Sequence, residues 1–165
     1  MADGQPHADS PTRVVELVVN LDDVTGEQVG ATIDRLLAAG ALDAWATPIT
    51  MKKGRPAVSL SVLAKDDQQD AIARQLLAET GSFGVRYRTW DRLVLDRATH
   101  TRQTALGQLR IKAGSLEGQP ITAKPEFDDV LALADSADVS LQEAQRVARS
   151  AADSLLAELK GANHA

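Results

Sequence analysis

Hydrophobic and polar residues alternate in several segments of the first hundred positions, which is the pattern of β-strands that bury one face. The clearest case is the segment 13–21, whose odd positions from 15 onward are all valine or leucine. Successive side chains of a strand point to opposite faces, so one face of this segment is entirely apolar. Three further strands are predicted at residues 43–51, 58–62 and 83–97.

Apolar residues recur at helical spacing in two segments that lie between these strands. The first is Thr25–Ala39, which opens on the capping-box sequence Thr-Gly-Glu-Gln and is followed by Gly40. The second begins after Asp66 or Asp67 and ends at Gly81. The order βαββαβ is typical of a ferredoxin-like fold. We therefore expect an antiparallel sheet with the first and third strands at its centre and both helices on one face.

The rest of the sequence predicts a smaller unit of a different character. Two short strands flank a turn at 105–107, an extended segment follows at 120–124, and two helices are expected at 125–136 and 140–159. The fold class is therefore α+β, a ferredoxin-like βαββαβ subdomain followed by a small β-hairpin and helical C-terminal subdomain. The expected boundaries are a disordered tail at 1–12, the ferredoxin-like subdomain at 13–97, a hairpin and two-helix subdomain at 98–160 that serves in oligomerisation, and a tail at 161–165.

Composition narrows the possible classes of protein and of site. The chain has 165 residues, 44% of them hydrophobic, but no apolar run approaches the ~18–20 residues of a membrane span. A net charge of −5 argues against non-specific nucleic-acid binding. The sequence has no cysteine, which excludes disulfides, thiolate nucleophiles and iron–sulfur clusters and agrees with a cytoplasmic location. Any chemistry is therefore expected to centre on metal ions and phosphates.

Two adjacent carboxylates, Asp22 and Asp23, directly follow the first predicted strand. Carboxylates at a strand end are suitable ligands for a hard divalent cation such as Mg²⁺ or Mn²⁺. Aspartates in front of a helix also commonly accept hydrogen bonds from its first N–H groups. The residues alone leave both a metal site and simple helix capping open, and capping is the commoner of the two.

A short basic turn separates the second and third predicted strands. It contains Lys52, Lys53 and Arg55, with a glycine and a proline that favour a tight turn. Two ammonium groups and a guanidinium suit a polyphosphate, because arginine can bind a phosphate through two parallel hydrogen bonds. The alternative is an ordinary solvated hairpin, which is the commoner situation for such a sequence.

A basic stripe runs along the predicted strand at 83–97. Its alternate positions Arg86, Arg88, Trp90 and Arg92 share one face. Basic residues continue beyond it at Arg97, Arg102, Arg110 and Lys112. Such a face is suited to binding phosphates or stacking a base. It is equally suited to salt bridges with Asp91, Asp96 or a neighbouring subunit.

Several motifs resemble the C-terminal half of the LarC family. They include Asn-Leu-Asp-Asp-Val-Thr at 20–25, Leu-Leu-Ala-Ala-Gly-Ala-Leu-Asp at 36–43 and Thr-Pro-Ile-Thr-Met-Lys-Lys-Gly-Arg-Pro at 47–56. Further matches are Glu-Thr at 79–80, Gly-Val-Arg at 84–86, Leu-Asp-Arg at 95–97, Gly-Gln-Leu-Arg-Ile-Lys at 107–112 and Lys-Pro-Glu-Phe-Asp-Asp at 124–129. Because separate motifs occur in the right order over about residues 13–150, the resemblance is specific.

The resemblance implies an activity. LarC-like proteins insert nickel into pyridinium-3,5-bisthiocarboxylic acid mononucleotide and so make the nickel-pincer cofactor of lactate racemase. They use CTP with a divalent metal, and their C-terminal half binds the nucleotide. The resemblance thus implies a nickel chelatase, a CTP-dependent cyclometallase of the lyase class, with Ni²⁺ as substrate. From their charge and placement, the expected site residues are Asp22 and Asp23 for Mn²⁺ or Mg²⁺, and Lys52, Lys53, Arg55, Arg86 and Arg88 for CTP.

The resemblance also implies partners. Family members usually carry a larger N-terminal half that this sequence lacks, so we expect full nickel insertion to need that half from elsewhere. The implied partners are the pyridinium mononucleotide and further copies of the chain in a trimer-based homo-oligomer, with neither nucleic acid nor membrane. An alternative is a non-catalytic ferredoxin-like module that binds nucleotide and regulates or assembles a partner, because this fold serves many functions.

The placement of the two charged clusters leads to one further expectation. In the usual ferredoxin-like arrangement, we expect the basic turn at 52–56 to lie at the opposite end of the sheet from Asp22 and Asp23. A single site that uses both clusters then needs two chains. We therefore expect a metal and nucleotide site between subunits.

Overall fold

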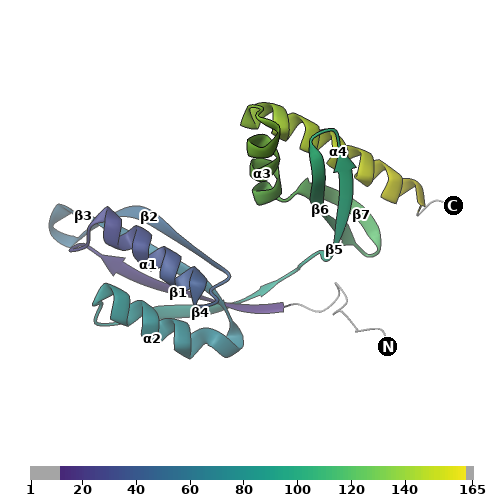
Figure 1. The fold of residues 1–165 in the computed structure, drawn as a ribbon. Coiled ribbons are helices and arrows are strands. Elements are labelled where there is room, and N and C mark those ends of the chain that lie inside the picture. Colours follow the sequence, from purple (N-terminus) through teal and green to yellow (C-terminus); the bar gives the residue numbers. More distant parts are fainter. Residues whose placement is uncertain (1–11, 163–165) are drawn as a thin grey trace. The chain divides into compact units, whose positions relative to one another are not determined.

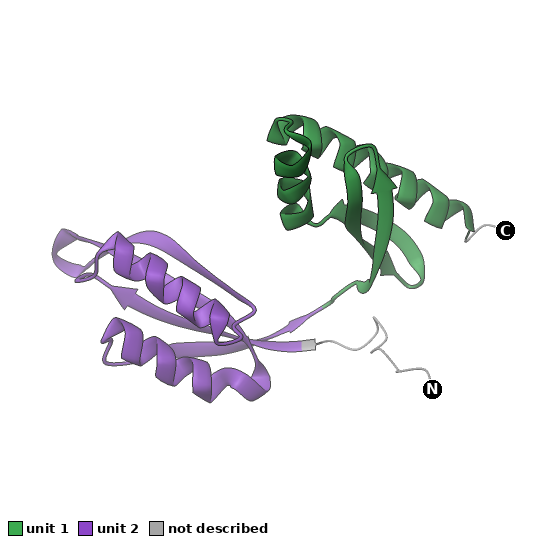
Figure 2. Ribbon diagram, viewed as in Figure 1, with its two compact units in different colours: residues 1–10, 93–165 green, residues 11–92 purple. Residues whose placement is uncertain are grey.

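The computed structural model describes residues 12–162 and divides the chain into two compact units, with the division between Arg92 and Leu93 (Figure 2). Each unit has a hydrophobic core of its own. The division falls earlier than residue 97, where the strand pattern placed it. Within residues 12–162, no helix is long and apolar enough to cross a membrane.

The first unit has the expected order of elements. Its helices and strands are β1 (Thr12–Leu21), α1 (Gly26–Ala38), β2 (Asp43–Met51), η1 (Lys52–Gly54), β3 (Arg55–Lys65), η2 (Asp66–Gln68), α2 (Gln69–Thr80) and β4 (Arg86–Arg92). The four strands form an antiparallel sheet in the order β2-β3-β1-β4. The central places of β1 and β3 are those that the ferredoxin-like pattern predicts, and α1 and α2 lie on the same face of the sheet (Figure 1).

The alternation along β1 determines which face of the sheet is covered. Val15, Leu17 and Val19 are at most 1% exposed and pack in one cluster with Leu36 of α1 and Leu76 of α2. Burying apolar side chains of this size stabilises the fold by roughly 1.5–3 kcal/mol each. The even positions of β1 point to the opposite face, which neither helix of this unit covers.

The second unit is a three-stranded antiparallel sheet with two helices. Its elements are β5 (Asp96–Thr104), β6 (Gly107–Leu116), β7 (Gln119–Pro125), α3 (Phe127–Ala137) and α4 (Leu141–Ala162). Leu109 and Ile111 of β6 pack against Val130 of α3 and Leu155 of α4, all nearly inaccessible to solvent. The extended segment expected at 120–124 is thus a full strand, and α4 continues to Ala162, beyond the expected start of the C-terminal tail. The expected N-terminal tail lies outside the described residues, apart from Thr12.

The prediction of a single strand at 83–97 is wrong, because this segment contains two strands that belong to two different sheets. β4 pairs with β1 only from Arg86 to Arg92. The pairing ends there because Arg92 lies opposite Thr12, the first residue of β1. β5 then starts at Asp96 and pairs with β6 of the second unit. Residues 93–95, Leu-Val-Leu, lie between the two strands, and the hydrogen-bonding partner changes across them.

Candidate functional site

The end of β1 and the start of β3 lie side by side, because the two strands are antiparallel and Leu21 pairs with Val58. The β2–β3 hairpin comes directly before β3, so it lies at the same end of the sheet as Asp22 and Asp23 (Figure 1). The topology therefore brings the basic turn and the aspartate pair together within one chain.

An ion pair joins the two clusters. Nη1 of Arg55, the first residue of β3, lies 2.8 Å from Oδ2 of Asp22, whose side chain is 19% exposed. This Asp22 oxygen is buried and accepts no well-aligned hydrogen bond within the described part of the chain. The expectation that the clusters lie at opposite ends of the sheet is wrong. A hairpin between β2 and β3 lies beside the end of any strand that pairs antiparallel with β3.

Helix capping does not explain the aspartates. The N-cap of α1 is Thr25, whose side chain accepts a hydrogen bond from the backbone N–H of Gln28. The Gln28 side chain in turn accepts from the backbone N–H of Thr25, which completes the capping box. The alternative reading of Asp22 and Asp23 as caps is therefore overturned. Asp22 contacts Arg55 instead, and Asp23 is exposed beside it.

The donor set fits a divalent cation only with help from a ligand. Within residues 12–162 there is no group of three or more His, Cys, Asp or Glu side chains placed to hold a metal. Two carboxylates suffice for Mg²⁺ or Mn²⁺ when phosphate oxygens and water complete the coordination. Asp22 and Asp23 thus fit a cation that arrives with a nucleotide better than a resident metal ion.

The basic turn has an unusual backbone. Lys53 and Gly54 both adopt left-handed conformations, with φ of 64° and 69°. A lysine in this region is strained, and such strain is concentrated at functional sites. Lys52 and Lys53 are both exposed, and neither forms a salt bridge among the described residues. Their ammonium groups are available to an anionic ligand.

Arg86 and Arg88 lie on the uncovered face of the sheet, as their alternate spacing predicts, because they pair with Val18 and Glu16 of β1. The Arg86 side chain donates a hydrogen bond of 2.9 Å to Oδ1 of Asn20, two residues before Asp22. The Arg88 guanidinium lies 5.0 Å above the ring of Trp90, further from the end of β1. Arg86 therefore joins the candidate site by its hydrogen bond to Asn20. Asn20 is uncharged, so the search for charged clusters did not assign it a role.

The continuation of the basic stripe into the second unit forms salt bridges, which was the alternative to phosphate binding, but with carboxylates other than Asp91 and Asp96. Three of its cations are ion-paired within their own unit: Arg102 with Glu158, Arg110 with Asp129 at 2.6 Å, and Lys112 with Glu126 at 2.6 Å. The Arg110 side chain and its backbone N–H both donate hydrogen bonds to Asp129, which lowers the pKa of this carboxyl to about 2. Arg110 and Lys112 thus join β6 to α3 and to Glu126 directly before it, and Arg102 joins β5 to α4.

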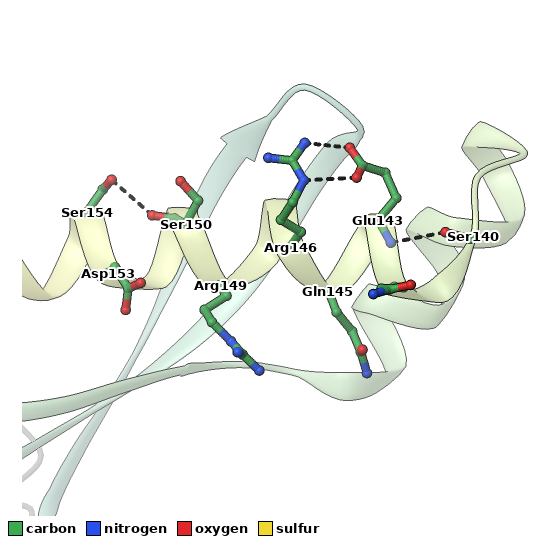
Figure 3. Close-up of a pocket in the computed structure, with 9 residues that line it drawn as sticks. Ser140, Glu143, Gln145, Arg146, Arg149, Ser150, Asp153 and Ser154 are labelled. Atoms are coloured by element: carbon green, nitrogen blue, oxygen red, sulfur yellow. Dashed lines mark hydrogen bonds and ion pairs between the residues drawn. The ribbon is translucent and has the colours of Figure 1, made fainter.

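A large hollow follows the outer side of α4, with a volume of about 740 Å³ (Figure 3). Its lining residues all belong to α4 or are Ser140, directly before it. Arg146 donates hydrogen bonds of 2.9 and 2.6 Å to Glu143, which lowers the pKa of Glu143. All lining residues come from α4 and Ser140, so no second element supplies groups that could surround a ligand. The Arg146 side chain is also already paired with Glu143. We therefore do not assign a site to this hollow.

The comparisons with known proteins agree on one family. The family model described as nickel insertion protein matches residues 3–145. The pyridinium-3,5-bisthiocarboxylic acid mononucleotide nickel insertion protein of Lactiplantibacillus plantarum is 38% identical over 143 residues, which are 86% of this chain and 34% of that protein. A protein of Roseiflexus castenholzii that is also named for nickel insertion is 43% identical over 132 residues, 80% of this chain and 33% of its own length. The chain thus spans about a third of the curated relatives it matches.

Solved structures show a similar fold. The apo form of LarC2, the C-terminal domain of a cyclometallase involved in the synthesis of the NPN cofactor of lactate racemase, superimposes with a TM-score of 0.82 at 35% identity. The match covers 87% of this chain and 99% of that domain. A protein from Methanopyrus kandleri AV19 matches with a TM-score of 0.63 at 27% identity, over 87% of this chain and 88% of that one.

Proposed function

The chain belongs to the nickel insertion protein family, and on this basis we propose that it forms the part of a nickel insertase that binds CTP with Mn²⁺ or Mg²⁺. The proposed whole enzyme is a CTP-dependent cyclometallase, a lyase that places Ni²⁺ into pyridinium-3,5-bisthiocarboxylic acid mononucleotide. Its product is the nickel-pincer cofactor of lactate racemase. The remainder of the enzyme, which corresponds to the larger N-terminal part of the relatives, is proposed to be supplied with this chain or by another.

The 2.8 Å contact between Asp22 and Arg55 is the observation that carries this proposal. It puts a carboxylate pair and a group of three cations at one end of one sheet. A nucleoside triphosphate with a divalent cation needs both: carboxylates for the metal and cations for the phosphate oxygens left over. A site with only one of the two clusters suits either a metal or a phosphate, but not their complex.

The residues take distinct roles in this proposal. Asp22 and Asp23 hold the divalent cation, which neutralises part of the triphosphate charge when it is bound. Lys52 and Lys53 bind phosphate oxygens from the hairpin, and Arg55 exchanges its contact with Asp22 for one with a phosphate. Arg86, oriented by Asn20, and Arg88 extend the cationic surface along β4.

Nickel is the substrate metal in this proposal and needs no thiolate from this chain. The chain has no cysteine, but the two thiocarboxylates of the pyridinium substrate are themselves soft ligands for nickel. We further propose a trimer-based homo-oligomer in which residues 98–160 mediate assembly.

Isothermal titration calorimetry tests the nucleotide assignment. CTP with Mn²⁺ is expected to bind the full chain, and ATP and GTP to bind more weakly if the base is recognised. Absence of CTP binding with either Mn²⁺ or Mg²⁺ would overturn the proposal. Turnover then separates an enzyme from a regulatory module: with the N-terminal part and substrate added, an enzyme consumes CTP, whereas a sensor leaves it intact.

A further inference from the structure

A single phenylalanine stands out from the surface between α2 and β4. The Phe83 side chain is as accessible as in an extended peptide, with a relative exposure of 110%. Leaving such a ring in water forfeits the stabilisation that its burial would bring. Val85, two residues further on, packs against the core of the unit, so the exposure is confined to the turn itself.

The turn that carries Phe83 is ordered by its own hydrogen bonds. Gly81 ends α2 in a left-handed conformation with φ of 66°. The backbone N–H of Ser82 donates to Oγ1 of Thr80 at 3.3 Å, and the Ser82 hydroxyl donates to the carbonyl oxygen of Gly84 at 3.0 Å. The ring is thus presented by a defined turn rather than by a long loop, and both of its faces are open.

This turn lies at the same end of the sheet as Asp22. β4 begins at Arg86, opposite Val18 of β1, and the chain before it runs toward the end of β1 (Figure 1). β3 flanks β1 on its other side and begins at Arg55. Since neighbouring strands are ~4.8 Å apart, the turn and Arg55 lie on either side of the end of β1, about 10 Å apart across the sheet. Arg55 lies a further ~10 Å along β3 from Val58, the partner of Leu21. That span suits a nucleotide whose phosphates and base occupy opposite sides.

We propose that Phe83 stacks on the base of the nucleotide held at Asp22, Lys53 and Arg55, an inference that rests on the function proposed above. Base–aromatic stacking requires an open ring face at a fixed position near the phosphate site, and Phe83 offers both. A protein-docking hot spot is instead typically surrounded by neighbouring contacts that exclude water. The neighbours of Phe83 in the turn are Ser82 and Gly84, which leave room for one flat group.

Two ligands separate base stacking from phosphate binding. Calorimetry with Mg²⁺ measures the affinity of the full chain for CTP and for inorganic tripolyphosphate, which has no base. Phe83→Ala is expected to weaken CTP binding about tenfold, within the range that lost stacking causes, and to leave tripolyphosphate binding unchanged. Phe83→Trp retains an aromatic face and is expected to bind CTP as well as the natural chain does.

The matched control is Leu37→Ala, at a 42% exposed apolar residue in the last turn of α1, away from the end where β1 finishes. It is expected to change neither affinity. Unchanged CTP binding in Phe83→Ala, or equal losses for CTP and tripolyphosphate, would overturn the stacking role while the proposed nucleotide site stands. If the natural chain itself binds no CTP, the proposed function fails, and the role of Phe83 fails with it.

Discussion

The carboxylate of Asp22, directly after β1, and the guanidinium of Arg55, at the start of β3, face each other at 2.8 Å. Asp22 belongs to the aspartate pair between β1 and α1, and Arg55 belongs to the basic turn between β2 and β3. Their contact brings an aspartate pair and a basic hairpin together in one candidate site, and the predictions about ligand binding depend on it.

Replacing Lys53 by alanine is expected to weaken CTP binding. A lost charge-assisted phosphate contact costs about 1.5–3 kcal/mol, which corresponds to about 10- to 150-fold in Kd. Alanine and lysine are both strained at a φ of 64°, so the substitution changes the charge without relieving the backbone. Lys65→Ala, at the other end of β3, is the control and should bind CTP normally in the same calorimetric titration. Equal effects of the two variants would point to overall charge rather than to a phosphate contact.

Asp22→Asn is expected to weaken the dependence of CTP binding on the divalent cation. The amide keeps the size of the side chain but loses the negative charge that holds the cation. The measurement is the ratio of CTP affinities with and without Mn²⁺, which should fall by about tenfold or more, as for the loss of a charged contact. Asp67→Asn, at an exposed aspartate of η2, should keep the ratio of the natural chain. A full Mn²⁺ effect in Asp22→Asn would remove this residue from the metal site.

Mixing the two variants tests whether the site lies within one chain. The contact between Asp22 and Arg55 is formed within a single chain, and Lys53 is on the same hairpin as Arg55. Mixed oligomers of Lys53→Ala and Asp22→Asn therefore contain no intact site, and CTP binding should not recover after subunit exchange. Recovery to about a quarter or a half of the sites would show instead that two chains share each site.

Asp129 is expected to make stability depend on pH in the acid range. Hydrogen bonds from Arg110 lower its pKa in the folded protein from 3.8 to about 2. A carboxyl with a lowered pKa contributes stability that is complete above its unfolded pKa and is lost as pH falls toward its folded value. Urea unfolding of the natural chain should therefore show a loss of stability between about pH 4 and pH 2 that Asp129→Asn reduces. Asparagine can still accept from the Arg110 backbone N–H, so the fold should survive.

Cutting the chain after Arg92 tests the role of the second unit. Every residue of the first unit's core lies before Arg92, so the fragment is expected to fold. If residues 98–160 mediate assembly, it should elute as a smaller oligomer than the full chain in size-exclusion chromatography. Circular dichroism and a cooperative thermal transition are the controls for folding. An unchanged oligomeric state would assign assembly to the first unit.

The order and type of elements in the first unit could be predicted from the sequence alone. A strand with one buried face and a helix with one buried stripe have different periods, and the capping box at Thr25 is local in sequence. The same reasoning failed at residues 93–95, where the chain leaves one sheet for another. The alternation of hydrophobic and polar residues indicates which face of a strand is buried, but not which other strand it pairs with.

The sequence by itself determined the residue types of the site: two adjacent carboxylates, a basic turn, and arginines at alternate positions of a strand. Only the tertiary structure decided which of them meet, because the antiparallel pairing of β1 and β3 sets the end of the sheet at which the hairpin lies. In the folded chain, Arg110 and Lys112 form ion pairs with carboxylates of their own unit. The Phe83 side chain is fully exposed at the end of the sheet where Asp22 lies. The pattern of hydrophobic and polar residues indicated the strand order of the first unit, but an ion pair between two side chains far apart in the chain depends on their positions in the folded sheet, which the pattern does not specify.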